Sequence, residues 1–177
     1  MRVASLGSAI PTNLDDIWAV AWTPLGYTLE GSSQSYAPAY DDVDVAEELE
    51  ALDSVATGRT LSVSFGLAEN TAKNLKLAYN GGVVTFVPAG TAPVTRAFTR
   101  FEPPELGVEL LTMIGFESED GKERIVWKQC KQTGSVETAR RKGAEKAGIP
   151  CEFRAFKPAD GTAPFTRMST RGTDGVI

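Results

Sequence analysis

The feature that most constrains this fold is a strict alternation of apolar and small side chains over residues 59–67. Apolar side chains occupy every second position: Leu61, Val63, Phe65 and Leu67. The positions between them hold threonine, serine or glycine. Because successive side chains of a β-strand point to opposite faces, this spacing predicts a strand with one buried face and one small, polar face.

Shorter runs of the same kind recur along the chain, at 17–22, 83–87, 108–116, 123–130 and 151–156. Turn-forming residues separate several of them: Asn80-Gly81-Gly82, Pro88-Ala89-Gly90, Pro103-Pro104 and Asp120-Gly121. Many short strands with turns between them favour a mainly β fold, an antiparallel sandwich or barrel. Three tryptophans within these runs are expected in the core, because an indole buries a large area: Trp18, Trp22 and Trp127.

One flanking α-helix is expected within 69–79. The residues that share a face at helical spacing are Ala72, Leu75 and Tyr79. Asn70 or Thr71 can cap the start of this helix, and Gly81 suits the left-handed conformation just past its end. A helix this short is marginal alone, so we expect it to cover the sheet.

The length and composition indicate one domain. The chain has 177 residues, 42% of them hydrophobic, which is enough for one core. We place a β domain at 1–158 and include in it a long loop at about 24–53, rich in Ser, Gln and Pro. A loop of that length is either mobile or a segment that binds another molecule. Residues 159–177 have little to bury and form a C-terminal extension that we expect to be flexible.

Charged clusters and loop aromatics mark the candidate contact sites. Seven carboxylates fall within the thirteen residues 41–53, with no basic residue among them. They form either a solvated charge run or a surface that faces a water-filled passage or a basic patch on a neighbouring copy. The basic cluster at 139–146 is either that patch or a solvated turn. The candidate inter-subunit contacts are Pro24, Leu25, Tyr27, Tyr36, Tyr40, Asp42, Asp44, Glu47, Glu48, Arg140, Arg141 and Lys142.

The residue types present exclude much enzyme chemistry. Histidine is absent, which removes the commonest general base and zinc ligand. No nucleophile elbow, phosphate-binding loop or dinucleotide fingerprint occurs, and Ala46 and Glu47 stand where a calcium loop needs glycine. Cys130 and Cys151 are too few for a disulfide scaffold and are expected to be reduced, buried thiols. We therefore expect no catalytic, cofactor-binding or metal site, and no enzyme.

The formal net charge is −5, which argues against a protein that grips nucleic acid, because such a protein presents a basic patch. The first ten residues carry one charge and no sustained apolar run, so we expect no signal peptide. No stretch approaches the ~20 apolar residues of a membrane span. We expect the protein to be made and folded in a cytoplasm, without a membrane partner.

The order of these patterns is itself informative. The run Trp22-Thr23-Pro24-Leu25-Gly26-Tyr27 continues to Gly31 and precedes the acidic segment with Val43 and Val45. The strand-to-helix run 62–75 follows, and then two late strands at 124–130 and 149–156. Over 17–158 the chain resembles the major tail tube proteins of long, non-contractile-tailed bacteriophages, a family related to the tube proteins of contractile tails and type VI secretion.

The resemblance implies a structural virion protein without a cofactor. Its fold would be a β-sandwich or barrel with one helix, and six copies would form a ring around a lumen. Rings would stack into a tube along a tape measure protein, with tail terminator and tail tip proteins as further partners. Double-stranded DNA would pass through the lumen without specific binding. The implied location is the phage tail, assembled in the cytoplasm of the host bacterium.

Other functions stay open at this point. A tail terminator or a secretion-system tube ring of the same β family would make rings that do not polymerise. An enzyme built on the clustered carboxylates, or a solitary binding module, would form neither rings nor tubes. Electron microscopy of concentrated protein distinguishes these alternatives.

Overall fold

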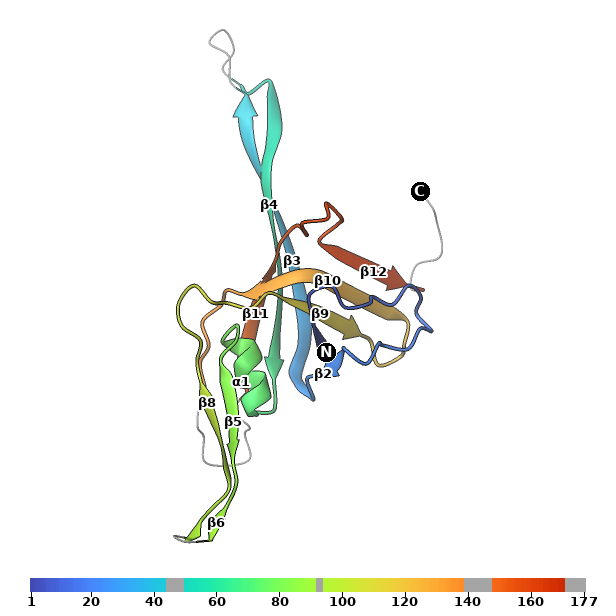
Figure 1. Ribbon diagram of the computed structural model, residues 1–177. Coiled ribbons are helices and arrows are strands. Elements are labelled where there is room, and N and C mark those ends of the chain that lie inside the picture. Colours follow the sequence, from blue (N-terminus) through green and yellow to red (C-terminus); the bar gives the residue numbers. More distant parts are fainter. Residues whose placement is uncertain (44–49, 92–93, 139–147, 171–177) are drawn as a thin grey trace.

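Antiparallel strands make up most of the molecule, as the alternation predicts. The computed structural model describes residues 1–43, 50–91, 94–138 and 148–170 and is drawn in Figure 1. Its elements in chain order are β1 (Arg2–Ser5), β2 (Thr23–Pro24), β3 (Thr28–Val43), β4 (Asp53–Leu67), α1 (Ala72–Ala78), β5 (Val83–Val87), β6 (Gly90–Thr91), β7 (Val94–Thr95), β8 (Phe98–Glu102), β9 (Thr112–Glu117), β10 (Glu123–Gln132), β11 (Ile149–Ala155) and β12 (Phe165–Ser169). Within the described residues the fold is therefore mainly β, with antiparallel sheets and a single helix.

Eight strands form one bent sheet. Its order is β2-β1-β9-β10-β11-β4-β3, and β12 also pairs with β10. β10 pairs with β12 over its first half and with β11 at its end, and its register with β9 shifts between Trp127 and Cys130. A register irregularity of this kind bends a strand. In Figure 1, β3, β4 and β11 accordingly run steeply across β9, β10 and β12.

The predicted alternation in β4 is confirmed, and it builds the main core. Its four apolar side chains are each at most 5% exposed: Leu61, Val63, Phe65 and Leu67. Phe65 stacks on Phe153 of β11, with the ring centroids 5.7 Å apart, and Trp127 of β10 belongs to the same cluster. Each buried side chain of this size contributes about 1.5–3 kcal/mol relative to exposure. The buried face of β4 therefore stabilises the packing of β4 and β11 against β10.

A second, smaller core involves β9 and β10, and the loop after β1 covers it. Trp18 and Trp22 are buried there in edge contact, with ring centroids 4.8 Å apart. Gly115 makes room for them, because a Cβ at that position would lie 2.6 Å from the Trp18 ring. All three tryptophans are core residues, as predicted. The strand expected at 17–22 is wrong, because the backbone turns there and Trp22 N–H donates to the Ala19 carbonyl at 2.8 Å.

Helix α1 is shorter than predicted and presents a different face to the core. Thr71 caps it by accepting a hydrogen bond from Asn74 N–H. The buried residues are Asn74, Leu77 and Ala78, whereas Leu75 is the one member of the predicted face that packs against the core. The Asn74 amide donates to the carbonyls of Leu25 and Glu69, at 3.3 and 2.8 Å. Because these hydrogen bonds satisfy the amide group, Asn74 can be buried on the core-facing side of the helix, where helical periodicity predicts apolar residues.

The end of α1 is fixed to β10. Asn80 takes the left-handed conformation directly after the helix, with φ 55°, and Gly81, the residue predicted for this role, follows with a positive φ of 136°. The Asn80 side chain donates to the Gln132 carbonyl and accepts from Gln132 N–H, both at 2.7 Å. Gly81 N–H donates to the Lys76 carbonyl at 2.8 Å, which closes the last turn in the manner of a Schellman cap.

The long loop expected at about 24–53 is largely strand. β3 pairs antiparallel with β4 along most of its length. The sequence of β3 shows no alternation that would predict a strand, because nearly all of its described side chains are exposed. The C-terminal extension is also partly ordered, since β12 pairs with β10 and Phe165 packs against the main core; residues 171–177 lie outside the described part of the chain.

The other predicted strands are confirmed with shifted ends. The runs at 83–87, 123–130 and 151–156 correspond to β5, β10 and β11. The run predicted from 108 starts as a strand only at 112, because Val108 and Leu110 lie in an exposed loop. Neither β1 nor β8 was predicted. Both cysteines are free and buried, as expected.

Candidate functional site

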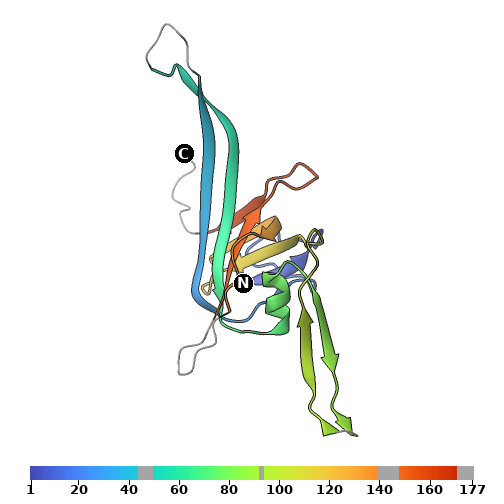
Figure 2. The ribbon, with the colours of Figure 1, turned by 90° about the vertical axis from the view of Figure 1, so that its left-hand side faces the viewer.

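The outer halves of β3 and β4 form a two-stranded ribbon that projects from the body. We call residues 36–43 and 53–60 the upper ribbon. The first eight residues of β4 are all exposed, and burial begins at Leu61; Figures 1 and 2 both show the ribbon extending from one end of the molecule. An isolated pair of strands is only marginally stable in water, so this ribbon has surface to bury against another molecule.

Aromatic and aliphatic side chains on the upper ribbon are exposed together with carboxylates. Tyr36, Tyr40 and Val55 are each more than half exposed. Asp41 and Asp42 lie on the same ribbon and are exposed. Apolar side chains grouped among polar ones are typical of interaction surfaces. The upper ribbon is therefore both apolar and acidic.

A second ribbon projects from the opposite end of the molecule. β5 pairs with β8, and β6 and β7 continue in the same direction; we call 83–87 and 98–102 the lower ribbon. Its exposed large apolar side chains are Val83, Val84, Phe86 and Phe98. At its base the rings of Phe101 and Tyr79 lie 5.6 Å apart. The predicted strand 83–87 thus exists, but it carries apolar side chains to the surface.

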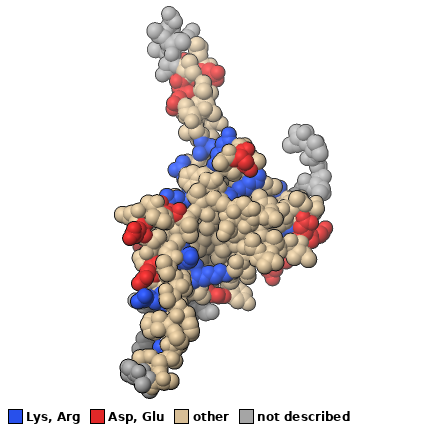
Figure 3. All heavy atoms as spheres, viewed as in Figure 1, with Lys and Arg blue, Asp and Glu red and all other residues tan. Residues whose placement is uncertain are grey.

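The lower ribbon and the segment 95–97 before β8, which together we call the lower end, expose two arginines and one glutamate. Arg100 forms an exposed ion pair with Glu102 at 3.4 Å, and Arg96 precedes β8 and is exposed. In Figure 3 the outer part of the upper ribbon carries acidic atoms, with basic atoms where it joins the body, and the lower end carries both kinds; the one basic residue of the upper ribbon is Arg59. The two ends of the molecule therefore differ in charge.

β3 is an open edge of the sheet. Among the described strands it pairs only with β4, so one side of its backbone has no strand partner over Thr28–Val43. Within the described segments β12 pairs only with β10, and β2 pairs only with β1 at the other end of the sheet, so these strands leave shorter edges. Unpaired strand edges are templates for pairing with another chain. These edges can therefore accept a strand from another copy.

The sheet face of β3, β4 and β11 that points away from the core carries small polar side chains. The Ser33 and Ser64 hydroxyls are hydrogen-bonded at 2.7 Å, and Glu152 of β11 lies in register with Ser64. A hollow of about 790 Å³ opens on this face and is lined by these three residues among others. The small, polar face predicted for 59–67 is confirmed.

The structure divides the candidate contact residues into three groups. Five of them are exposed: Pro24, Tyr27, Tyr36, Tyr40 and Asp42. Leu25 is a correction, because it is 2% exposed and belongs to the main core of its own subunit, where the Asn74 amide bonds its carbonyl. The remaining candidates lie outside the described residues: Asp44, Glu47, Glu48, Arg140, Arg141 and Lys142.

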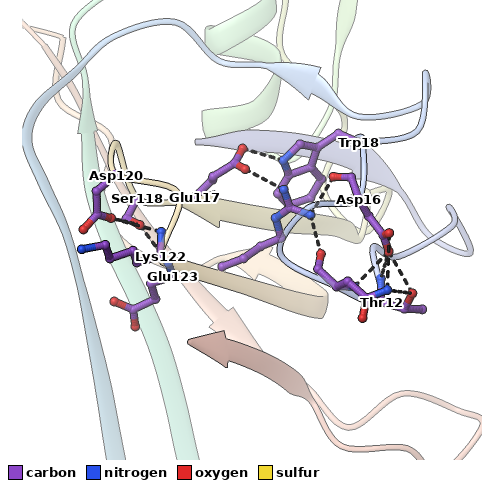
Figure 4. Close-up of polar contacts among 10 residues, drawn as sticks. Thr12, Asp16, Trp18, Glu117, Ser118, Asp120, Lys122 and Glu123 are labelled. Atoms are coloured by element: carbon purple, nitrogen blue, oxygen red, sulfur yellow. Dashed lines mark hydrogen bonds and ion pairs between the residues drawn. The ribbon is translucent and has the colours of Figure 1, made fainter. Parts of the chain in front are cut away.

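Sequence reasoning missed a buried ionic cluster, which we call the Arg124 clamp. The Arg124 guanidinium donates to the carbonyls of Asn13 and Asp16, both at 2.9 Å, and to the Glu117 carboxylate at 2.6 Å. It lies over the Trp18 ring, 4.8 Å from the centroid, and Trp18 Nε1 donates to Glu117 at 2.7 Å (Figure 4). These residues meet only in the folded chain, so no spacing in the sequence reveals them.

Both carboxylates of this region are held in their ionised form. Burial alone would raise the pKa of Glu117, but hydrogen bonds from Arg124 and Trp18 outweigh it and hold the pKa below its ordinary value. Hydrogen bonds from the Thr12 hydroxyl and from the N–H groups of Thr12 and Asn13 lower the pKa of Asp16 to about 2. Since neither group exchanges protons near neutral pH, the clamp fits a structural role rather than acid–base catalysis.

The described residues carry little that could act in catalysis. No group of three or more His, Cys, Asp or Glu side chains among them could hold a metal ion. Burial raises the pKa of both Cys130 and Cys151 to about 12, so these thiols stay protonated and are poor nucleophiles. The one helix of the described segments falls short of the length and apolarity that a membrane crossing needs.

Comparison with known proteins adds no relative: no family model matches this sequence, and no curated protein is similar enough to count as a match. The features left to explain are two projecting ribbons of unlike charge, an open strand edge and a polar sheet face. Each of these features offers surface that another molecule could cover.

Proposed function

We propose that this protein is the major tail tube subunit of a long, non-contractile bacteriophage tail, a structural protein whose hexameric rings stack into the conduit for DNA delivery. The observation that carries the proposal is the pair of ribbons that project from opposite ends of one β body. Contact surfaces at two ends give a head-to-tail contact, and such a contact builds a filament where its repetition does not close. The hexameric ring and the passage of double-stranded DNA come from the sequence resemblance over 17–158.

The charges of the two ribbons favour this head-to-tail arrangement. The upper ribbon exposes three aspartates, Asp41, Asp42 and Asp53, against the single Arg59. The lower end exposes Arg96 and Arg100 against the single Glu102. Complementary charges fix the register and orientation of a contact more than its affinity. The exposed tyrosines and phenylalanines would supply the buried apolar area. We therefore expect the upper ribbon of one subunit to meet the lower end of the next.

Pairing of open strand edges would join the subunits within a ring. Closing many copies of a sheet into one barrel removes the unpaired edges that β3 and β12 present. A large barrel alternates side chains between a packed face and a face that lines water. The hydroxyl-rich face around Ser33 and Ser64 is our candidate for the lumen wall. In a chain of net charge −5, such a wall suits passage of DNA without binding it.

The resemblance alone supports the remaining parts of the proposal. They are the tape measure, tail terminator and tail tip proteins as partners, the tail of the virion as the location, and a non-enzymatic role without a cofactor.

Electron microscopy of the purified protein over a range of concentrations tests the proposal. We expect monomers at low concentration, and rings and tubes in negative stain at high concentration. Rings that never stack would instead support a tail terminator or a secretion-system tube ring. Monomers alone at every concentration and salt level would overturn both assembly functions.

A further inference from the structure

We propose that the loop between β1 and β2 of one copy docks into a hollow beside α1 of a neighbouring copy. We call residues 15–20 of this loop the knob. The inference rests on the self-assembly proposed above, and it adds a specific lateral contact that neither ribbon nor strand edge supplies.

The knob holds apolar side chains in water on a rigid support. Ile17 is 94% exposed, and Val20 is fully exposed. Between them Trp18 is buried, and the Arg124 guanidinium holds the Asp16 carbonyl at 2.9 Å. The clamp therefore prevents the loop from turning Ile17 inward. A side chain presented in a fixed position loses little conformational entropy on binding, so Ile17 is suited to anchor a contact.

The hollow lies between α1 and β1 and has a volume of about 280 Å³. Its apolar lining includes Val3, Ala4, Leu77 and Leu110. Lys73 and Lys76 of α1 also line it and are exposed. Lys73 donates to the Pro24 carbonyl at 3.3 Å, but among the residues that the structure describes neither lysine forms an ion pair. In Figure 3 basic atoms gather over the α1 side of the body.

Knob and hollow are complementary in polarity and in charge. Asp15 is exposed two residues before Ile17, and it makes no hydrogen bond or ion pair within the described segments. If Ile17 enters the apolar hollow, Asp15 comes close to Lys73 and Lys76 at its edge. An apolar anchor surrounded by paired charges is the usual anatomy of a specific interface. The charges would then select the orientation in which the anchor enters.

The occupant of the hollow is a second copy, because the Ile17 side chain is exposed to water in its own subunit and does not fill that subunit's hollow. The loop that carries the knob also lines the hollow with Ala21 and Thr23, but the Arg124 clamp holds the Asp16 carbonyl and so keeps Ile17 outside it. Because the knob and the hollow consist of different residues, copies can join head to tail through them, and such a contact closes into a ring where the rotation permits. The ribbons project along another axis, so this contact and stacking do not compete.

Cysteine cross-linking tests the contact directly. Subunits with Ile17→Cys are mixed with subunits carrying Lys76→Cys at a concentration that permits assembly, under mild oxidation. We expect a disulfide-linked dimer from the mixture and none from either variant alone. Ile17→Cys mixed with Lys122→Cys, which lies in the turn between β9 and β10, is the matched control and should give no dimer. The native cysteines are buried and should not react.

Charge reversal gives a second, independent measurement. Asp15→Lys should raise the protein concentration for half-maximal assembly by about three- to tenfold, as should Lys73→Glu combined with Lys76→Glu. A chain with all three substitutions should recover much of the loss. All three side chains are exposed in the monomer, so we expect the thermal midpoint of each monomeric variant to match that of the wild type. A lowered midpoint would reveal a folding defect.

The outcomes separate this contact from the tube function. Tubes that form without the mixed dimer, and that tolerate the charge reversals, would overturn the knob contact and leave the proposed function intact. The mixed dimer in a protein that forms neither rings nor tubes would support the contact and overturn the tube. Absence of both the dimer and assembly would overturn both.

Discussion

The Glu117 carboxylate is the counter-ion of a guanidinium that is almost wholly buried, since Arg124 is 2% exposed. Glu117→Gln leaves that charge without its partner. A hydrogen bond to a charged group contributes about 1.5–3 kcal/mol, so we expect the free energy of unfolding at pH 7 to fall by that amount. Urea denaturation measures it. Glu119→Gln, an exposed neighbour, is the control and should change little.

The same residues predict a loss of stability in acid. Because the pKa of Glu117 is lowered in the folded protein, the unfolded chain binds its proton first, and the stabilisation is lost as pH falls through the folded pKa. Asp16, with a pKa of about 2, acts in the same direction. We expect the wild type to lose stability between about pH 5 and pH 2, and its advantage over Glu117→Gln to shrink over that range. An advantage that stays constant into acid would contradict this account.

At the scale of elements, the lower ribbon is the sharpest test of self-assembly. Phe86 and Phe98 are 66% and 52% exposed, so replacing both with serine should change the monomer's stability by less than about 0.5 kcal/mol each. If these rings are buried between copies, each truncation should cost the contact more than about 1 kcal/mol. We expect a normal thermal midpoint with little or no tube formation in sedimentation. Thr99→Ser on the same ribbon is the control.

Which elements the sequence could predict depended on whether they bury one face. The strand 59–67 alternates because one face packs on the core, and its side chains follow the pattern. β3 has nearly all of its described side chains in water, so its Ser-rich sequence looks like a loop. The run 17–22 has the alternation of a strand, but the chain turns within it, so Trp18 and Trp22 are buried while Val20 between them is fully exposed.

The candidate site was predictable only in part, for a related reason. Tyr36 and Tyr40 are candidates because aromatics in a long loop indicate a segment that binds another molecule, and Asp42 is one because it belongs to the acidic run. All three are exposed. The prediction that Leu25 is an inter-subunit contact is wrong, because Leu25 packs in the main core against α1 and β4, which are distant in sequence. The sequence analysis predicted no contact residue on the lower ribbon, because the run 83–87 has the composition of a core strand. Only the tertiary structure shows that this strand projects from the body and exposes its apolar side chains.

At the scale of the whole molecule, assembly should change where the backbone is protected. The upper ribbon has no packing on either face beyond Leu61, so its amides should exchange rapidly in the monomer, as weakly supported segments do. In a tube, contact with the next subunit should slow exchange in peptides that cover 36–43 and 53–60. β10, which is central in the sheet, provides the internal reference. Equal protection of the upper ribbon in monomer and tube would exclude it from the contacts.

Reversing the charge at each end tests whether subunits stack head to tail. Asp41→Lys with Asp42→Lys should block stacking, and so should Arg96→Glu with Arg100→Glu, because each places like charges at the same contact. A chain with all four changes should stack again, since the opposite signs are restored with the ends exchanged. Raising the salt concentration should weaken all of these differences, because surface charges are screened within about 8 Å at physiological ionic strength.

Negative-stain images of the three variants decide between the possible arrangements. In one outcome, both double variants form rings but no tubes, and the fourfold variant forms tubes. This outcome would mean that the ribbons of subunits in adjacent rings meet, and that ribbons within one ring do not. If the double variants fail even to form rings, the ribbons act laterally, and the opposite directions of the two ribbons in Figures 1 and 2 would not define the tube axis. Normal tubes from every variant would assign stacking to the apolar side chains or to residues outside the described segments, because charge would then have no part in it.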